Sequence, residues 1–209
     1  MDQNYLFLGA HPDDIEFGAG ATIAKARSQG INCRSAIFSD CHESLDSQVG
    51  LDFILQESKE AHSVLGVSDE SISIFDFPVR NFSTHRQQIL QSMIDDFADV
   101  KWDKVFIPNR NDIHQDHSVI STEAMRAFKF STILGYELPW NNFISNVNYY
   151  NLISESNLQA KIAAISCFNS QANRFYSGAE KVTTTLRFRG LQVRQEYAEA
   201  FEIYRFIQQ

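Results

Sequence analysis

The sequence predicts an α/β fold: one Rossmann-like domain over residues 1–209, with three layers and a mainly parallel sheet. Short apolar runs alternate with amphipathic stretches along the chain, and the connections between them are short. Polar clusters directly follow two of the apolar runs. In an open parallel sheet, ligands gather beyond the carboxyl ends of the strands, where the strand order reverses. We therefore expect the functional site at that edge.

Five apolar runs read as strands, and they lie at 4–10, 31–39, 72–77, 103–108 and 132–138. Amphipathic stretches that read as helices connect them, at 20–30, 51–65, 84–100 and 117–129. Gly30 and Gly66 mark the ends of the first two helices.

The pattern weakens after residue 140. A strand is expected at 146–153 and a helix at 155–167, while 196–207 could begin as a helix and finish as a strand. The Phe and Tyr residues of this half form either ordinary core or an interface between copies of a homo-oligomer.

Composition limits the class of function. The chain has 209 residues, of which 44% are hydrophobic and 17 are Phe, enough to bury one sizeable core. Its formal net charge of −8 argues against a nucleic-acid binder, because affinity for phosphates requires Lys and Arg. No apolar run in the sequence approaches the roughly 20 residues of a membrane helix. We expect a small-molecule partner, without nucleic acid or membrane.

Cysteine usage indicates the compartment. Cys33, Cys41 and Cys167 are odd in number and form no CxxC pair, which disfavours a disulfide framework or a thiolate metal site. The first ten residues have no basic region of a secretory signal. A cytoplasmic location is therefore expected.

Two polar clusters stand at the ends of predicted strands. His11, Asp13 and Asp14 follow the first strand, and NRNDIHQDH at 109–117 follows the fourth. In a doubly wound order such as 3-2-1-4-5 these two strands are neighbours at the reversal point, so the clusters converge. Imidazoles with a carboxylate are typical zinc ligands, although the same donors accept Fe²⁺ and other divalent transition metals. A spare carboxylate could then move a proton, and a spare imidazole could stabilise an oxyanion.

Each signal also has a simpler explanation. A helix cap or a turn is the commoner use of an acidic residue in such a place, and this alternative applies to Asp13, Asp14, Asp112 and Asp116. For Asp116 we favour the cap. His114 and His117 alone could mark a solvated helix start, but that explanation weakens when a complementary cluster ends the neighbouring strand.

The remaining polar residues near these motifs have ordinary interpretations. Glu16 is expected to interact with a helix dipole. The surface, or a satisfied buried position, is expected for His42, His62 and His85. Gly18 and Gly20 lack the GxGxxG spacing of a dinucleotide site.

AHPDD at 10–14 and HQDH at 114–117 resemble the two signature motifs of the LmbE/PIG-L family of zinc-dependent N-deacetylases, whose pattern is A-H-P-D-D-E and H-x-D-H. The tail RFRGLQVRQEYAEAFE at 187–202 resembles the closing segment of that family. The resemblance implies removal of an acetyl group, mostly from amino-sugar conjugates.

Carried over by position, the resemblance implies that His11, Asp14 and His117 ligate zinc. It makes Asp13 the general base that activates water and then protonates the leaving amine. It makes His114 the residue that stabilises the tetrahedral intermediate.

Departures from the family pattern concern the substrate. Ile15 stands where the family usually has Glu, and SDCHES at 39–44 replaces a segment like T-D-G-E. The helix at 50–66 lacks the family's arginine, which contacts substrate hydroxyls or a phosphate. Possible substitutes, each of which could simply be solvent-exposed, are Arg80, Arg110 and Arg189.

The expected function is a zinc-dependent hydrolase that removes an N-acetyl group from an amino-sugar or sugar-nucleotide conjugate. One alternative is a metal-dependent hydrolase of another amide or an ester. Another is a catalytically inactive sugar- or nucleotide-binding module, which the complete set of five site residues argues against.

Overall fold

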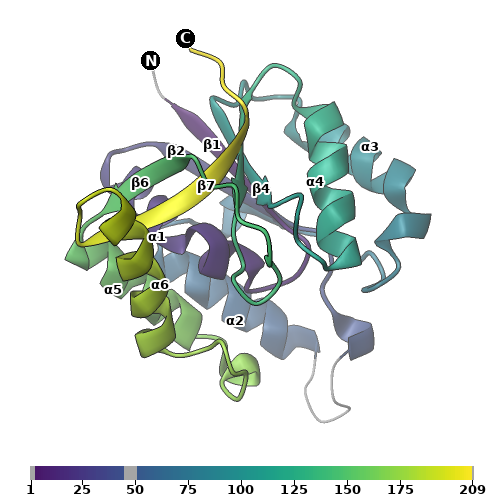
Figure 1. Ribbon diagram of the computed structural model, residues 1–209. Coiled ribbons are helices and arrows are strands. Elements are labelled where there is room, and N and C mark those ends of the chain that lie inside the picture. Colours follow the sequence, from purple (N-terminus) through teal and green to yellow (C-terminus); the bar gives the residue numbers. More distant parts are fainter. Residues whose placement is uncertain (1–2, 45–50, 209) are drawn as a thin grey trace.

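The computed structural model describes residues 3–44 and 51–208, and these form one seven-stranded sheet with helices on both faces (Figure 1). The strands are β1 (Asn4–Gly9), β2 (Asn32–Ile37), β3 (Ile72–Ile74), β4 (Lys104–Pro108), β5 (Thr132–Tyr136), β6 (Tyr149–Ile153) and β7 (Tyr197–Arg205). The helices are α1 (Asp14–Ser28), α2 (Leu51–Val64), α3 (Arg86–Phe97), α4 (Gln115–Ala127), α5 (Glu155–Ser166) and α6 (Ala179–Gln192).

The sheet has the order β3-β2-β1-β4-β5-β7-β6. Its first five strands are parallel and confirm the predicted order 3-2-1-4-5, whereas β7 pairs antiparallel with both β5 and β6. The order reverses between β1 and β4, so the loops after these two strands are adjacent.

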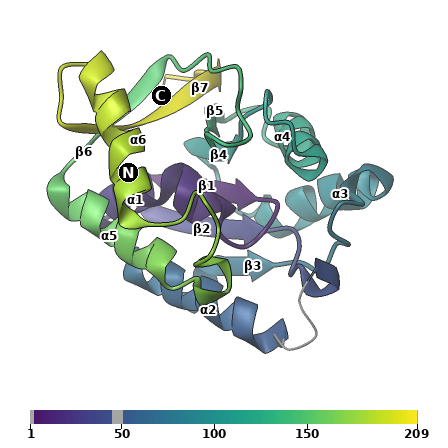
Figure 2. The same cartoon turned by 60° about the horizontal axis from the view of Figure 1, so that its bottom comes forward.

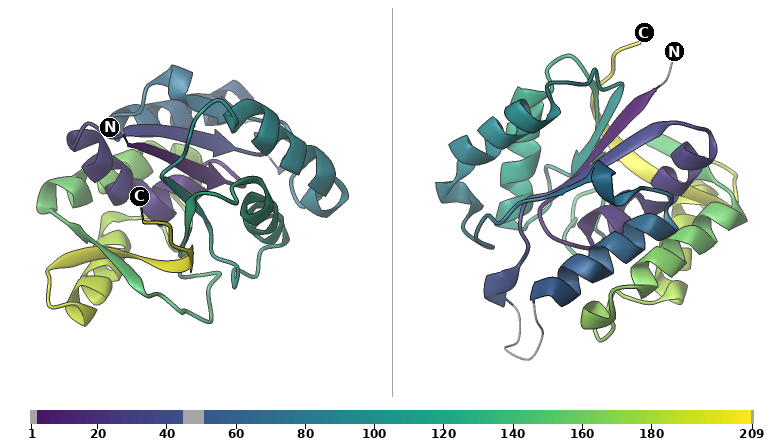
Figure 3. Two further views of the ribbon diagram at one scale, coloured as in Figure 1. Left: turned by 90° about the horizontal axis from the view of Figure 1, so that it is seen from above. Right: turned by 180° about the vertical axis from the view of Figure 1, so that it is seen from behind.

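Side chains alternate between the two faces of the sheet and build two cores. Leu6 and Leu8 of β1 pack into the core beneath α3 and α4, whereas Tyr5 and Phe7 pack into the core beneath α1, α2, α5 and α6. Figure 2 shows α3 and α4 together on one side, and Figure 3 shows α2 beside α5 on the other. None of the described helices is long and apolar enough to cross a membrane.

The C-terminal segment differs from the prediction. Residues expected to begin as a helix are strand from Tyr197 to Arg205, and the preceding helix α6 was not predicted. Strand β7 lies between two other strands, so its backbone groups bond on both edges. The backbone hydrogen bonds to β5 and β6 outweigh the helical tendency suggested by the spacing of polar residues in this segment.

Helix α1 begins at Asp14, six residues earlier than predicted from 20–30. Gly18 and Gly20 could be taken for turn residues in the sequence, but both lie within this helix, where they let other side chains pack closely against it. A Cβ on Gly18 would lie 2.1 Å from the ring of the buried Tyr136. Glycine at this position lets the first half of α1 lie directly against β5.

A buried ion pair anchors the middle of α1. The Lys161 Nζ lies 2.6 Å from Glu199 Oε1 and donates to the carbonyl of Phe17 at 2.5 Å. The Glu199 carboxylate accepts the backbone amides of Ala21 at 3.0 Å and Thr22 at 2.6 Å. Side chains of α5 and β7 therefore hold the helix that carries the first polar cluster.

Replacing Glu199 with Gln is expected to lower the free energy of unfolding by about 3–5 kcal/mol, because Lys161 would remain charged and buried without its partner. Urea denaturation measures the change. The control is Asp99→Asn, which removes the surface pair with Arg34 (side-chain exposures 68% and 23%) and is expected to cost less than about 1 kcal/mol. Equal effects of the two substitutions would contradict the anchoring role.

Candidate active site

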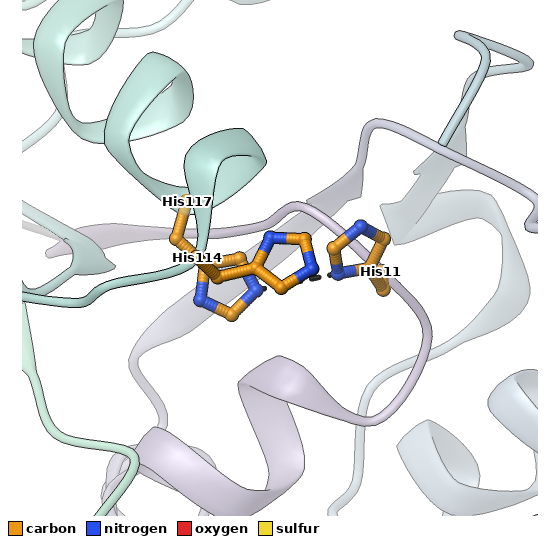
Figure 4. A group of neighbouring side chains, drawn as sticks. All are labelled: His11, His114 and His117. Atoms are coloured by element: carbon orange, nitrogen blue, oxygen red, sulfur yellow. Dashed lines mark hydrogen bonds between the residues drawn. The ribbon is translucent and has the colours of Figure 1, made fainter. Parts of the chain in front are cut away.

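The two polar clusters meet at the carboxyl edge of β1 and β4. His11 lies in the loop after β1, while His114 and His117 lie at the start of α4. Figure 4 shows the three imidazoles grouped between that loop and the first turn of α4. One ring nitrogen from each lies within 4.8 Å of the others. The predicted convergence is confirmed.

The side chain of Asp14 completes a tighter triangle with two of these rings. Its Oδ2 lies 3.5 Å from His11 Nδ1 and 3.2 Å from His117 Nε2, and the two nitrogens are 3.3 Å apart. Two ligand atoms bound about 2.0–2.1 Å from one tetrahedral zinc are separated by roughly 3.3–3.4 Å. The spacing of these three atoms therefore suits a small divalent cation more closely than the spacing of the three imidazoles.

Two further carboxylates orient the imidazoles from behind. Asp112 Oδ2 lies 2.7 Å from His117 Nδ1, and Asp116 Oδ2 lies 3.1 Å from His11 Nε2. Each carboxylate binds the ring nitrogen that faces away from Asp14, so the other nitrogen would direct its lone pair toward the triangle once the ring is neutral. Carboxylate–histidine pairs of this kind support metal sites in proteins.

The carboxylates perturb the protonation of both imidazoles. Burial lowers the pKa of His11, but its bonds to Asp116 and Asp14 outweigh burial and raise that pKa to about 9. Burial likewise opposes protonation of His117, whereas Asp14 and Asp112 raise its pKa to about 10. Burial raises the pKa of Asp14, but the two imidazoles outweigh it and hold that pKa far below its usual range. The triangle therefore holds dissociable protons that a cation would replace.

Asp13 stands beside the triangle in an unusual backbone conformation. Its φ is 89°, in the left-handed region that costs most residues about 1–2 kcal/mol and that Asp tolerates better than most. Burial raises the pKa of its carboxyl well above the usual range, and the neighbouring Asp14 and Glu16 raise it further. Among the described residues, none donates a hydrogen bond to this carboxylate. Asp13 is therefore available to exchange a proton with a bound molecule.

His114 caps helix α4 and faces the same site. Its Nδ1 accepts the amide of Asp116 at 3.3 Å, which assigns the proton of the neutral ring to Nε2. Burial lowers the pKa of His114, and the nearby His117 and His11 lower it further. The ring is thus a neutral hydrogen-bond donor, while the cap predicted for Asp116 is wrong because His114 holds that position.

The three candidate arginines lie in different places. Arg80 is exposed, has a left-handed φ of 66°, and donates its backbone amide to Asp116 at 2.6 Å, beside the site. Arg110 is exposed and stacks over the Tyr204 ring at 5.9 Å. Arg189 forms a bidentate pair with Glu137 at 2.6 and 2.9 Å. Of the three, Arg80 is the one whose backbone amide is hydrogen-bonded to Asp116, the carboxylate that orients His11.

Three carboxylates have partners that the sequence does not indicate. Asp116 lies 3.1 Å from His11, so the cap predicted for it is wrong. Asp112 lies 2.7 Å from His117 and also accepts the amide of His114, as a turn residue does. Glu16 lies in the first turn of α1, as predicted, and its Oε1 is 2.9 Å from Nδ1 of the fully buried His62. The motif spacing places Asp112 and Asp116 five residues and one residue before His117.

A doubly wound sheet with histidines and carboxylates at its carboxyl edge defines a class of α/β enzymes whose chemistry sits at the strand reversal point. Within this class, the chain belongs to the PIG-L (LmbE-like) family. The family model described as GlcNAc-PI de-N-acetylase matches residues 6–128, more than half of the chain, and spans both motifs. Membership supports a hydrolase that acts as a deacetylase.

Individual relatives agree with the family assignment. The chain is 29% identical over 173 residues to the uncharacterized deacetylase YaiS of Escherichia coli K12, covering 77% of this chain and 87% of YaiS. The fold matches N,N'-diacetylchitobiose deacetylase from Pyrococcus horikoshii with a TM-score of 0.74, at 20% identity over 96% of this chain and 83% of that one. It also matches GalB, the 4-carboxy-2-hydroxymuconate hydratase of Pseudomonas putida KT2440, with a TM-score of 0.79, at 21% identity over 99% of both chains. These structural likenesses establish the fold, which hosts more than one reaction.

Binding of Zn²⁺ to the metal-free protein at pH 7 is expected to release protons, because His11 and His117, with pKa values of about 9 and 10, must deprotonate to become ligands. Apparent affinity should rise between pH 6 and 9, by up to about tenfold per pH unit for each displaced proton. Calorimetry in buffers of different ionisation enthalpy counts the protons. His42→Ala is the control, and a pH-independent affinity would contradict this arrangement.

Substituting Asp112 or Asp116 with Asn is expected to weaken metal affinity by about 10–100-fold, because an amide no longer fixes the orientation and tautomer of the imidazole. Competition with a chromophoric chelator measures the affinity. Asp95→Asn on the exposed surface of α3 is the matched control. Unchanged affinity in both site variants would exclude a supporting role.

Proposed function

We propose that this protein is a zinc-dependent hydrolase that removes the N-acetyl group from an amino-sugar conjugate, giving a free amine and acetate. The observation that carries the proposal is the triangle of His11 Nδ1, Asp14 Oδ2 and His117 Nε2, with separations of 3.2–3.5 Å. The family description, de-N-acetylase, and the diacetylated sugar named for one structural relative support this substrate class.

The donor set fits the proposed metal. Two imidazole nitrogens and one carboxylate oxygen suit a catalytic zinc site, which keeps one position open for solvent or substrate. A divalent cation held there supplies Lewis acidity, which polarises a carbonyl and acidifies water. Fe²⁺ accepts the same donors and is the alternative occupant.

Asp13 carries the proton in this mechanism. Its carboxylate takes a proton from the attacking water and returns it to the amine nitrogen as the C–N bond breaks. Burial raises the pKa of this carboxyl, and the neighbouring Asp14 and Glu16 raise it further, which strengthens the carboxylate as a proton acceptor. Because no described residue donates a hydrogen bond to it, the carboxylate does not have to break a bond before it acts.

His114 stabilises the negative charge that develops on the acyl oxygen. Its neutral ring offers Nε2–H to that oxygen because Nδ1 is occupied by the Asp116 amide. The cap on α4 therefore fixes both the ring and its tautomer. Arg80, exposed beside Asp116, is the proposed contact for substrate hydroxyls, and Arg110 and Arg189 are the other candidates.

Mass spectrometry of metal-loaded protein with a panel of N-acetyl sugars, O-acetyl sugars and other amides separates the possible activities. Deacetylation of an amino sugar yields a product that is lighter by one acetyl group. An inactive binding module would leave every compound unchanged, and preference for O-acetyl sugars would identify an esterase.

Asp13→Ala is expected to retain zinc but to lose about 10²–10⁴-fold in kcat, because it removes proton transfer without removing a ligand. Asp14→Ala is expected to lose zinc itself, since one of three ligands is gone. Metal analysis and acetate release together distinguish the two variants. If both kept zinc and near-normal turnover, the assignment of roles would be wrong.

A further inference from the structure

Residues of α1, α5, α6 and β7, with the segments that follow β5 and precede α6, line a cavity of about 480 Å³. This volume falls within the roughly 300–1,000 Å³ of small-molecule pockets. Phe17, Trp140 and Tyr176 form its aromatic wall, and Lys161 and Glu199 belong to its lining. An acetyl group alone is far smaller than this space, so the cavity suits another part of a bound molecule.

The cavity and the catalytic groups share two short segments. The amide of Phe17, which lines the cavity, donates to the carbonyl of Asp13 at 3.0 Å. Asn141 follows Trp140 and lies 3.5 Å from Asp112, the partner of His117. One substrate can therefore occupy the site and the cavity together.

The buried charges of the cavity wall are paired with one another. Lys161 binds Glu199 at 2.6 Å, and Arg189 binds Glu137 at 2.6 Å, with all four side chains at most 12% exposed. Glu180 and Lys181 also line the cavity, but both are exposed to solvent. A charged ligand group entering between the buried pairs would lose its hydration without gaining a free partner. The buried part of the cavity therefore selects an uncharged group.

The shape of the wall favours an apolar ring or chain. Trp140 and Tyr176 stack with ring centroids 3.8 Å apart, and Phe17 stands nearly perpendicular to both, at 5.2 and 5.4 Å. Such flat aromatic surfaces bury aliphatic and aromatic groups with little loss of side-chain entropy. Apolar burial would supply binding energy that the paired charges do not.

Asp13 decides which end of the substrate enters. In the proposed mechanism its carboxylate returns a proton to the amine nitrogen, so the amine side of the amide must lie toward Asp13. Because Asp13 adjoins the cavity through Phe17, the sugar attached to the amine extends toward the cavity together with the aglycone that it carries. We infer that this cavity binds an uncharged apolar aglycone of an amino-sugar substrate. This assignment of the leaving-group end rests on the proposed function.

Binding is tested without catalysis, using glucosides that carry no acetyl group. Hexyl and phenyl β-glucosides are expected to bind at least about tenfold tighter than methyl β-glucoside, because only they place apolar surface in the cavity. Fluorescence of Trp140 reports occupancy, since the second tryptophan, Trp102, lies in the other core. Trp140→Phe should remove the ligand-dependent signal. Equal affinity for all three glucosides would overturn the inference.

Variants that fill the cavity test whether the glucosides bind there. Thr185→Phe, which places a ring in the cavity, should abolish the preference for the hexyl glucoside, whereas Thr183→Phe, on the same helix but outside the lining, should keep it. Thr184→Phe is a second filling variant if Thr185→Phe does not fold. A preference that survives both filling variants would contradict the location.

Turnover distinguishes the two ends of the substrate. Hexyl N-acetyl-β-glucosaminide should show a KM at least about tenfold below that of its methyl counterpart. If a hexanoyl group on the nitrogen lowered KM instead, and the hexyl aglycone did not, the cavity would bind the acyl side of the substrate and the inference would be wrong. Deacetylation without any aglycone effect refutes only the inference, whereas glucoside binding without deacetylation refutes only the proposed function.

Discussion

The approach of two imidazoles to one buried carboxylate organises the whole site. His11 and His117 flank Asp14, and Asp112 and Asp116 bind the outer nitrogens of the two rings. Three carboxylates against two neutral imidazoles leave a charge of about −3 at a buried place, which is costly unless compensated. Protonation of both imidazoles, or binding of one divalent cation, would each add a charge of +2. The raised imidazole pKa values and the proposed affinity for a metal therefore follow from one charge imbalance.

Helix α1 links this charged centre to the body of the protein. Its first residue is Asp14, and its middle is held by Lys161 and Glu199 from α5 and β7. The antiparallel strand β7 lies outside the doubly wound unit that positions the two motifs. It nevertheless supplies the carboxylate that fixes the helix, so the C-terminal segment contributes to the geometry of a site formed by distant N-terminal residues.

The sequence predicted most of the parallel sheet and the meeting of the two motifs, because both follow from local patterns. Apolar runs mark buried strands, and the reversal point follows from strand order. The path of Tyr197–Arg205 could not be predicted, since pairing with β5 and β6 decided it rather than local spacing. The partners of Asp112 and Asp116 depend on side-chain directions after folding. A cap and a histidine partner look alike in sequence.

Backbone strain gathers around the same centre. Of the four described non-glycine residues with positive φ, Asp13, Cys41 and Arg80 lie near it, whereas Arg194 follows α6; such conformations cost of order 1–3 kcal/mol unless their surroundings hold them. Asp116 stabilises the backbone at Arg80. Its carboxylate accepts the amides of Arg80 and Phe82 at 2.6 and 3.3 Å, and it also binds His11. A single carboxylate thus couples the orientation of a candidate metal ligand to the backbone that presents Arg80. Asp116 consequently links the proposed metal ligand His11 to the proposed substrate contact Arg80.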